Sequence, residues 1–456
     1  TDEALAMLDA LKRELADPRP AHELKVRALR DRVRMREAAD LHALLAANGP
    51  SLAPETRAAA ADALLYLREP EQARDLYLGV LADQPEFFDA RLGLYYAYLE
   101  CEDFDRARAT LEEALAREPE YLFAEYRALR RHNSRNRELH RARAMFLAYD
   151  DRPGEAIAAQ QPLLMVAPMD LGLRSERASV YGFRGWPRRS LAEFEWILAA
   201  QPDALGARVG RAEQLLVLGE FESSRDESRA LMGDRPENLA VQRLDRAWTF
   251  FDRPELIVDA SWGQSSNPTV SGQQDFSVET WLYSPPLGYR TRLFAHGYET
   301  EGEYDEGDIG YGRWGAGLEY RWRDLTLTAE GHRGRVDEDR TGIELCAAWE
   351  ISDHWALSLR HDSNSLEAPL RGRPLGLTAR STSVDVSWRA HEARRIDLSA
   401  GQHDFSDSNE RTMFLAGWTE QLYARSAYRL DARLELYTSR NKATDRIYFC
   451  LLYTSD

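Results

Sequence analysis

The sequence predicts an α + membrane β chain, in which a helical solenoid over residues 1–248 precedes a transmembrane antiparallel β-barrel over residues 249–449. Two patterns predict it. Similar residues recur every 34 positions in the first part, and apolar residues alternate with polar ones in the second, as in strands with one apolar face. The chain has no run of about 18 apolar residues, which a transmembrane helix needs, whereas a barrel strand is recognised by alternation.

Composition excludes several classes of protein. The 456 residues, 44% apolar and 30% charged, are typical of a folded chain with a packed core. The net charge of −17, from 59 Lys and Arg against 76 Asp and Glu, argues against nucleic acid as a partner. Three Cys rule out a disulfide scaffold, and the ten His show no metal-ligand spacing, so we expect neither a metal nor another cofactor.

Prolines show the 34-residue period most clearly. Pro85 and Pro119 are 34 residues apart, and Pro168, Pro202 and Pro236 follow one another at the same interval. This period, with small residues between large ones and a closing proline, is the tetratricopeptide pattern. A proline stops a helix, so we expect helix pairs to end near these five positions. The alternative is a helical bundle without repeats.

One repeat can be followed residue by residue. Pro119 and Pro168 are 49 residues apart, which exceeds one repeat, so we expect an inserted helix or a bend near residues 120–136. A solenoid offers a long concave face to partners. The residues expected to pack between the paired helices are Leu94, Tyr98, Phe104, Ala107, Leu111 and Ala114.

Alternation begins after Pro254 and predicts about eleven strands by residue 440, with a twelfth beginning at Asp445. Tight turns at 323–324 and 352–354 alternate with long polar stretches, as in outer-membrane barrels. Strands of 9–11 residues favour membrane spanning over a soluble antiparallel sandwich, whose strands average about 5–6 residues. The long stretches are 264–273, 299–308 and 362–374, and the aromatic residues that suit two interfacial girdles include Trp281, Trp314, Trp349 and Trp388.

The polar register of the strands is the candidate site. If Trp, Leu and Val face lipid, the opposite register faces a lumen, because Arg at mid-membrane on the lipid side costs roughly 2–4 kcal/mol. We expect some of these carboxylates to pair with arginines and the rest to form a negative polymer path. The predicted lumen residues are Glu319, Glu330, Glu344, Glu350, Asp385, Asp397, Asp431 and Glu435.

The chain resembles the outer-membrane export porins for poly-β-1,6-N-acetylglucosamine, a biofilm exopolysaccharide. Helical repeats followed by a barrel carry this resemblance, together with strings at 184–188, 283–286, 370–379, 405–411 and 445–449. The order of domains alone would also fit cellulose- or alginate-type export porins. The resemblance implies a sixteen-stranded barrel, of which this chain would hold eleven or twelve strands. We expect residues 450–456 to be a sequencing-adapter scar; the alternative is a genuine strand end.

The resemblance further implies a periplasmic repeat domain that receives polymer and binds a polysaccharide deacetylase, and a barrel in outer-membrane lipid that passes partly deacetylated glycan outward. The other interpretation is a repeat scaffold anchored by a non-conducting barrel. We expect no enzyme, because GxSxG, HExxH, P-loop and GxGxxG motifs are lacking. His361, Asp362 and Ser363 are interpreted as loop residues, as are Glu299, Glu301 and Glu303.

Overall fold

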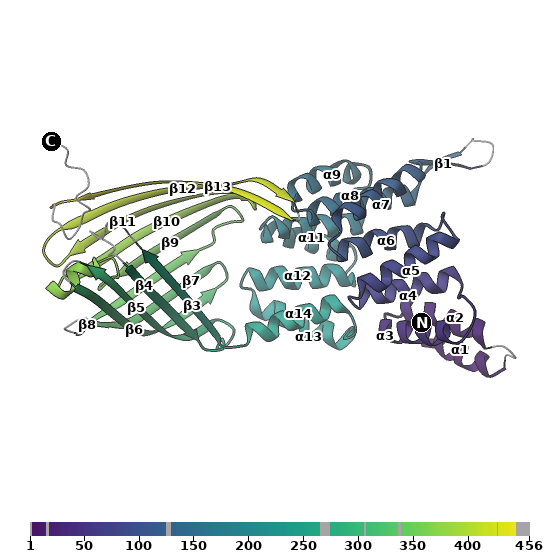
Figure 1. Ribbon diagram of the computed structural model, residues 1–456, viewed down its shortest axis with the longest axis horizontal. Helices are drawn as coiled ribbons and strands as arrows, with labels where there is room; N and C mark the ends of the chain where they lie inside the picture. The colour runs from purple at the N-terminus through teal and green to yellow at the C-terminus, as the bar shows by residue number, and fades with distance from the viewer. Residues whose placement is uncertain are drawn as a thin grey trace. The chain divides into compact units, whose positions relative to one another are not determined.

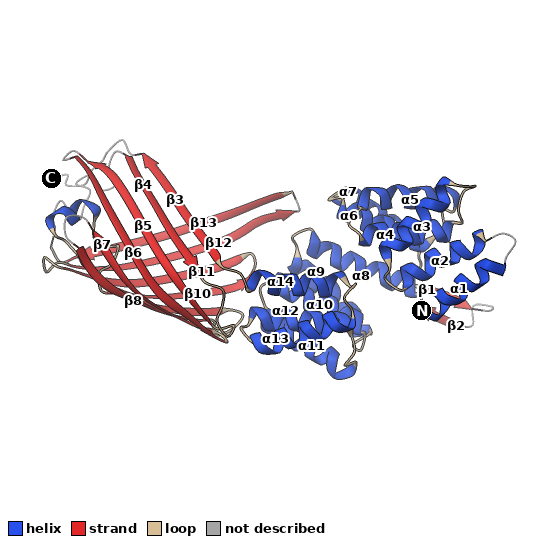
Figure 2. Cartoon of the chain, turned by 90° about the horizontal axis from the view of Figure 1, so that it is seen from below, coloured by secondary structure: helices blue, strands red, loops and turns tan. Residues whose placement is uncertain are grey.

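A computed structural model describes residues 2–14, 18–124, 129–264, 274–304, 307–335, 339–425 and 427–443. The segments 445–449 and 450–456, to which the sequence analysis assigned a twelfth strand and an adapter scar, lie outside these residues. Helices and strands follow one another along the chain, as Figures 1 and 2 show. Two compact units are present: Thr1–Val180 with Arg235–Leu239 and Ala424–Arg429, and Tyr181–Asp234 with Ala240–Tyr423 and Leu430–Asp456.

The helices repeat with the predicted period. Helices α9, α11 and α13 begin at Pro153, Pro187 and Phe221, which are 34 residues apart. Among the described helices, none is long and apolar enough to cross a membrane. The helices are α1 (Asp2–Glu14), α2 (Arg19–Asp31), α3 (Met35–Ala47), α4 (Pro54–Tyr66), α5 (Pro70–Asp83), α6 (Phe88–Glu100), α7 (Phe104–Arg117), α8 (Ser134–Tyr149), α9 (Pro153–Val166), α10 (Leu171–Phe183), α11 (Pro187–Ala200), α12 (Leu205–Val217), α13 (Phe221–Asp234) and α14 (Leu239–Phe251).

The predicted helix ends are confirmed. Helices α5, α7, α9, α11 and α13 each end two residues before one of the five prolines. The turn inside each repeat is also periodic, because its residue adopts a left-handed backbone that ends the first helix. That residue is glycine in two repeats and another amino acid in three: Arg68 (φ 65°), Glu102 (φ 58°), Asp151 (φ 56°), Gly185 (φ 71°) and Gly219 (φ 74°).

The insertion near residues 120–136 is a β-hairpin, so the predicted helix or bend is wrong. Strand β1 (Tyr121–Ala124) pairs antiparallel with β2 (Leu129–His132). The Arg130 guanidinium lies 3.9 Å from the centre of the Tyr121 ring on the partner strand. Aromatic residues favour strands, and Pro119 ends the preceding helix, so a short pair of strands is the local solution.

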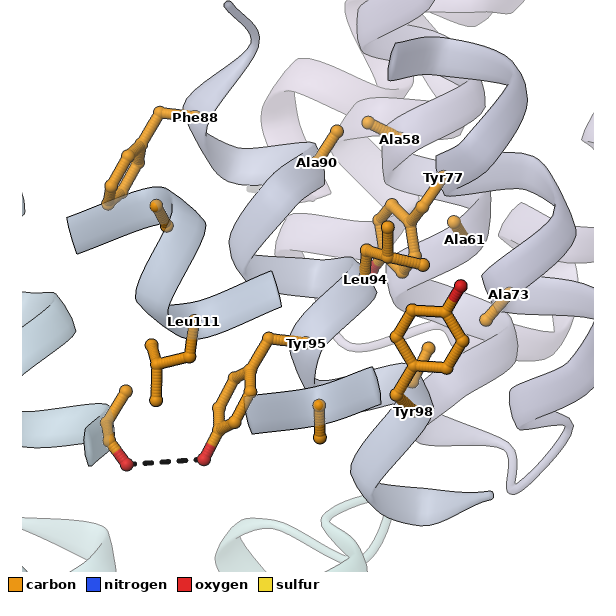
Figure 3. Packing of buried hydrophobic residues seen from close by; sticks show 14 of the residues in the cluster. Ala58, Ala61, Ala73, Tyr77, Phe88, Ala90, Leu94, Tyr95, Tyr98 and Leu111 are labelled. Atoms are coloured by element: carbon orange, nitrogen blue, oxygen red, sulfur yellow. Dashed lines mark hydrogen bonds between the residues drawn. The ribbon is translucent and has the colours of Figure 1, made fainter. Parts of the chain in front are cut away.

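Figure 3 shows the packing between helices of the first unit. Leu94, Ala107, Leu111 and Ala114 are buried in one cluster, as the repeat register predicted. Tyr95, which stands where such repeats usually carry a small residue, is also buried, and its hydroxyl donates to the carbonyl oxygen of Ala142 at 3.2 Å. The large side chain therefore reaches from α6 to α8, which follows the inserted hairpin.

The second part of the chain is one eleven-stranded antiparallel sheet, in which each strand pairs with its neighbours in sequence order. Strands β3 and β13 form its two edges among the described residues. The strands are β3 (Glu255–Gln264), β4 (Gln274–Tyr283), β5 (Thr291–Tyr304), β6 (Gly307–Trp322), β7 (Leu325–Arg335), β8 (Asp339–Trp349), β9 (Trp355–Asp362), β10 (Ala379–His391), β11 (Arg394–Phe405), β12 (Glu410–Arg425) and β13 (Tyr428–Asn441).

Two predicted loops differ from the structure. The stretch 299–308 belongs mostly to β5 and β6, so Glu299, Glu301 and Glu303 are strand residues. Charge alone suggested a loop there, but the pairing of β5 with β6 continues to Tyr304 opposite Gly307. The stretch 362–374 is a loop that contains most of a short 3₁₀ helix, η1 (Leu370–Leu375).

Two glycines in α12 give a matched test of repeat packing. A Cβ on Gly210 would lie 2.3 Å from the Phe194 ring of α11, whereas a Cβ on Gly206 would meet nothing within 4 Å. Gly210→Ala should destabilise the helices by about 1–3 kcal/mol through overpacking. Gly206→Ala should stabilise them by up to about 1 kcal/mol through helix propensity. Thermal unfolding followed by helical circular dichroism measures both; equal effects would contradict the packing.

Candidate functional site

Pairing divides the sheet into two faces of opposite character. The outer face, defined here as the one that carries Trp314 and Leu318, exposes large apolar side chains on successive strands. Residues directly opposite each other share a face, so Glu319, Thr328, Cys346, Arg360 and Ser383 all lie on the other, inner face. The sheet curves (Figure 2), and the alternation of the sequence thus separates an apolar surface from a charged one.

A buried ionic network occupies the inner face of β4 to β9. Arg313 lies at its centre and donates to Asp362 and to Glu344, both at 2.8 Å. Only 1% of the Arg313 side chain is exposed, so these carboxylates compensate a charge that water cannot reach. His296 lies 3.0 Å from Glu330 and 3.1 Å from Glu279, and His332 lies 2.9 Å from Asp362.

Glycines on the same face make room for the network. A Cβ on Gly315 would lie 2.1 Å from a carboxylate oxygen of Glu330. A Cβ on Gly342 would lie 2.3 Å from the His332 ring. Small residues at these inner positions let long charged side chains lie across neighbouring strands.

The loop between β9 and β10 folds over the network. Asn364 and Arg373 in this loop are buried, and the Asn364 amide donates to Asp362 at 2.9 Å. The Arg373 guanidinium lies 3.7 Å from the centre of the Tyr311 ring on the inner face of β6. This loop therefore narrows the space in front of the inner face near the ends of β6 and β9.

The structure brings the predicted residues together in two groups. Glu330 and Glu344 belong to the buried network. Glu350, Asp385 and Asp397 line one hollow together with Arg395 and Arg433.

Within this hollow, Asp397 lies 2.7 Å from Arg395, and Asp385 accepts a 3.0 Å hydrogen bond from Ser358. Glu350 lies one residue beyond the end of β8.

Three predicted residues lie apart from both groups. Glu319 is half-buried and directly opposite Arg292 of β5. Asp431 and Glu435 are exposed residues of β13, where Glu435 pairs with Arg433.

Sequence reasoning missed the centre of the network. Arg313 and His296 were not among the predicted residues, although both stand in the polar register between apolar neighbours. Asp362 was interpreted as a loop residue, but it ends β9 and is buried. His361 faces the opposite side and lies 2.8 Å from the Thr382 hydroxyl, so the two do not act together. Within the described residues, no group of His, Cys, Asp or Glu is placed to hold a metal ion.

Known families match both parts of the chain. The PgaA membrane beta barrel domain matches residues 251–451, and a tetratricopeptide repeat matches residues 64–132. The strand segment of this chain belongs to the PgaA barrel family. The helical solenoid of tetratricopeptide type and the membrane barrel domain that the sequence predicted are thus both confirmed.

Two curated relatives, from Escherichia coli K12 and Escherichia coli O157:H7, are each named poly-beta-1,6-N-acetyl-D-glucosamine export protein. Each is 27% identical over 435 residues, which cover 94% of this chain and 54% of the relative. The chain thus spans about half the length of these PgaA-type relatives.

Solved structures also resemble parts of the chain. One, described as a bacterial polysaccharide outer membrane secretin, is 30% identical and covers 43% of this chain and 66% of its own, with a TM-score of 0.39. A tetratricopeptide repeat protein from Parabacteroides merdae is 18% identical and covers 53% of this chain and 90% of its own, with a TM-score of 0.42.

Removal of the central cation tests the network. Arg313→Met should destabilise the folded sheet by about 3–5 kcal/mol, because Asp362 and Glu344 would remain buried without their partner. The matched control is Arg395→Met, whose ion pair with Asp397 is more than half exposed and should matter by less than about 1 kcal/mol. Thermal unfolding in detergent, read by loss of strand circular dichroism, compares the two. Equal midpoints would show that the network carries no stability.

Proposed function

We propose that this chain is part of an export porin that passes poly-β-1,6-N-acetylglucosamine across the bacterial outer membrane. The observation that carries the proposal is the charged inner face of an apolar-faced sheet, in a segment of the PgaA barrel family. The curated relatives are named as export proteins for this polymer. Because the chain spans 54% of their length, the substrate comes to it by this proposal alone.

The inner carboxylates divide into two roles in this proposal. Glu330 and Glu344 are held by His296 and Arg313, so they stiffen the wall and offer no free charge to a polymer. Glu319, Asp385 and Asp397 are only half-buried and can meet the ammonium groups of a partly deacetylated glycan. Weak, repeated sites suit conduction, because tight binding would hold the polymer in place.

The repeat part would serve on the periplasmic side, where it would receive polymer and bind a polysaccharide deacetylase. A solenoid suits this task because its concave surface can contact an extended partner. Neither role requires a catalytic residue, and the relatives are named for export alone. The polymer of another system, of cellulose or alginate type, would lack ammonium groups and gain nothing from the inner carboxylates.

Neutralising the half-buried inner carboxylates tests the export proposal. The triple variant Glu319→Gln, Asp385→Asn and Asp397→Asn should lower surface polymer severalfold in a strain that makes the polymer and lacks its own exporter. The matched control neutralises three acidic residues of β5 that face outward, Glu299, Glu301 and Glu303. Surface polymer is measured against the amount of folded protein in the same cells.

Unchanged export by the inner variant would remove the electrostatic step. Absence of export with every version of the chain, including the unaltered one, would favour the scaffold with a non-conducting barrel, for which the loop packed in front of the inner face offers a physical reason.

A further inference from the structure

The ends of α11 and α13 contact the short turns of the sheet. Both helices belong to the same compact unit as the strands. Residues 181–234 lie outside both matched family ranges, 64–132 and 251–451. The contacts come from the two turns that precede these helices, at Gly185 and Gly219, which are one 34-residue repeat apart.

Asp353 of the β8–β9 turn caps α11. Its carboxylate accepts hydrogen bonds from the backbone amides of Arg188 at 3.0 Å and Arg189 at 3.1 Å. These are the second and third residues of the helix, whose amides lack partners inside it. The residue at the cap position, Trp186, supplies no side-chain hydrogen bond. A distant aspartate, 6% exposed, thus takes the place of a local capping residue.

Trp186 and two arginines extend this contact to the neighbouring turns. The Trp186 indole donates to the carbonyl oxygen of Ala390 at 3.2 Å, and its ring meets the His354 ring edge-on at 5.5 Å. Arg184 pairs with Glu392 at 2.9 Å, and Arg188 pairs with Asp324 at 2.7 Å. Here the helices carry the positive charges and the turns the negative ones.

The next repeat reverses this polarity. Glu220 pairs with Arg323 at 2.9 Å, and Glu222 pairs with Arg290 at 2.8 Å, so the helix side is now negative. The hydrogen bond from Arg290 lowers the pKa of Glu222 and keeps the carboxylate ionised. A slip of one repeat would place Arg184 and Arg188 against Arg323 and Arg290, where like charges repel.

Apolar packing joins the same elements. Tyr289, in the turn before β5, packs on the buried cluster of α12, α13 and α14, and its ring meets that of Trp248 at 5.7 Å. A Cβ on Gly219 would lie 2.6 Å from the Arg323 carbonyl oxygen, so helix turn and strand turn touch through their backbones. The contact therefore combines a cap, a buried aromatic residue, four ion pairs and close backbone approach.

We propose that these contacts form a keyed joint, in which the short turns of the barrel accept the last helix pairs in one register, so that the barrel's structural unit begins near Tyr181 and not at residue 251. The partner of this surface is the chain's own solenoid, and the reversed charges of successive repeats set the register. The joint does not depend on which polymer, if any, the barrel carries.

Hydrogen–deuterium exchange of the full chain in detergent tests the joint. Asp353→Ala should speed exchange of the Arg188 and Arg189 amides roughly tenfold, because loss of a cap opens the first helical turn. The matched control is Asp407→Ala, an aspartate in the β11–β12 turn at the other end of the strands, which should leave α11 unchanged. Unaltered exchange at Arg188 and Arg189 in Asp353→Ala would overturn the joint.

Charge reversal tests the keying separately, and it serves also if Asp353→Ala disturbs the strands. Glu392→Arg should speed exchange at the start of α11, and the double variant Arg184→Glu with Glu392→Arg should restore the original rate. If the double variant exchanges as fast as the single one, the Arg184–Glu392 pair does not set the register, and the keyed joint is wrong.

Discussion

The separation of charge from apolar surface across a single sheet governs the rest of this structure. An ionised side chain on the lipid face of a membrane strand costs roughly 2–4 kcal/mol for Arg at mid-membrane. Inner-face charges escape that cost but then crowd one another, and burial makes each unpaired one expensive. Arg313 resolves the crowding by pairing with carboxylates from two strands, and glycines beside it provide the space. Wall stiffness and lumen charge thus come from the same residues.

The helical repeats obey a different constraint with a similar outcome. Each repeat must turn back after its first helix, and a left-handed residue at a fixed position does so. Because the period is fixed, the same turn recurs every 34 residues, and two of these turns, at Gly185 and Gly219, contact strand turns of the sheet. A repeat designed by packing alone thereby also supplies an evenly spaced set of contacts to another part of the chain.

Periodic features could be predicted from the sequence, and single contacts could not. Helix ends follow from proline spacing and strand faces from alternation, because both depend on local chemistry. The hairpin at 121–132 was missed, since a short insertion breaks the period and leaves no pattern of its own. Trp281 was assigned to an aromatic girdle, yet it lies on the inner face and stacks on His296 at 4.6 Å. Its partner lies on another strand, and pairing register alone brings them together.

Adjacent residues of β6 allow the central claim to be measured directly. In a background with Cys101, Cys346 and Cys450 replaced by serine, single variants Leu318→Cys and Glu319→Cys are placed in lipid vesicles. A charged, water-soluble thiol reagent should label Glu319→Cys, and a nitroxide-bearing lipid should quench a fluorophore attached to Leu318→Cys. Labelling of Leu318→Cys from water, with lipid quenching of the probe at Glu319→Cys, would contradict a charged inner wall.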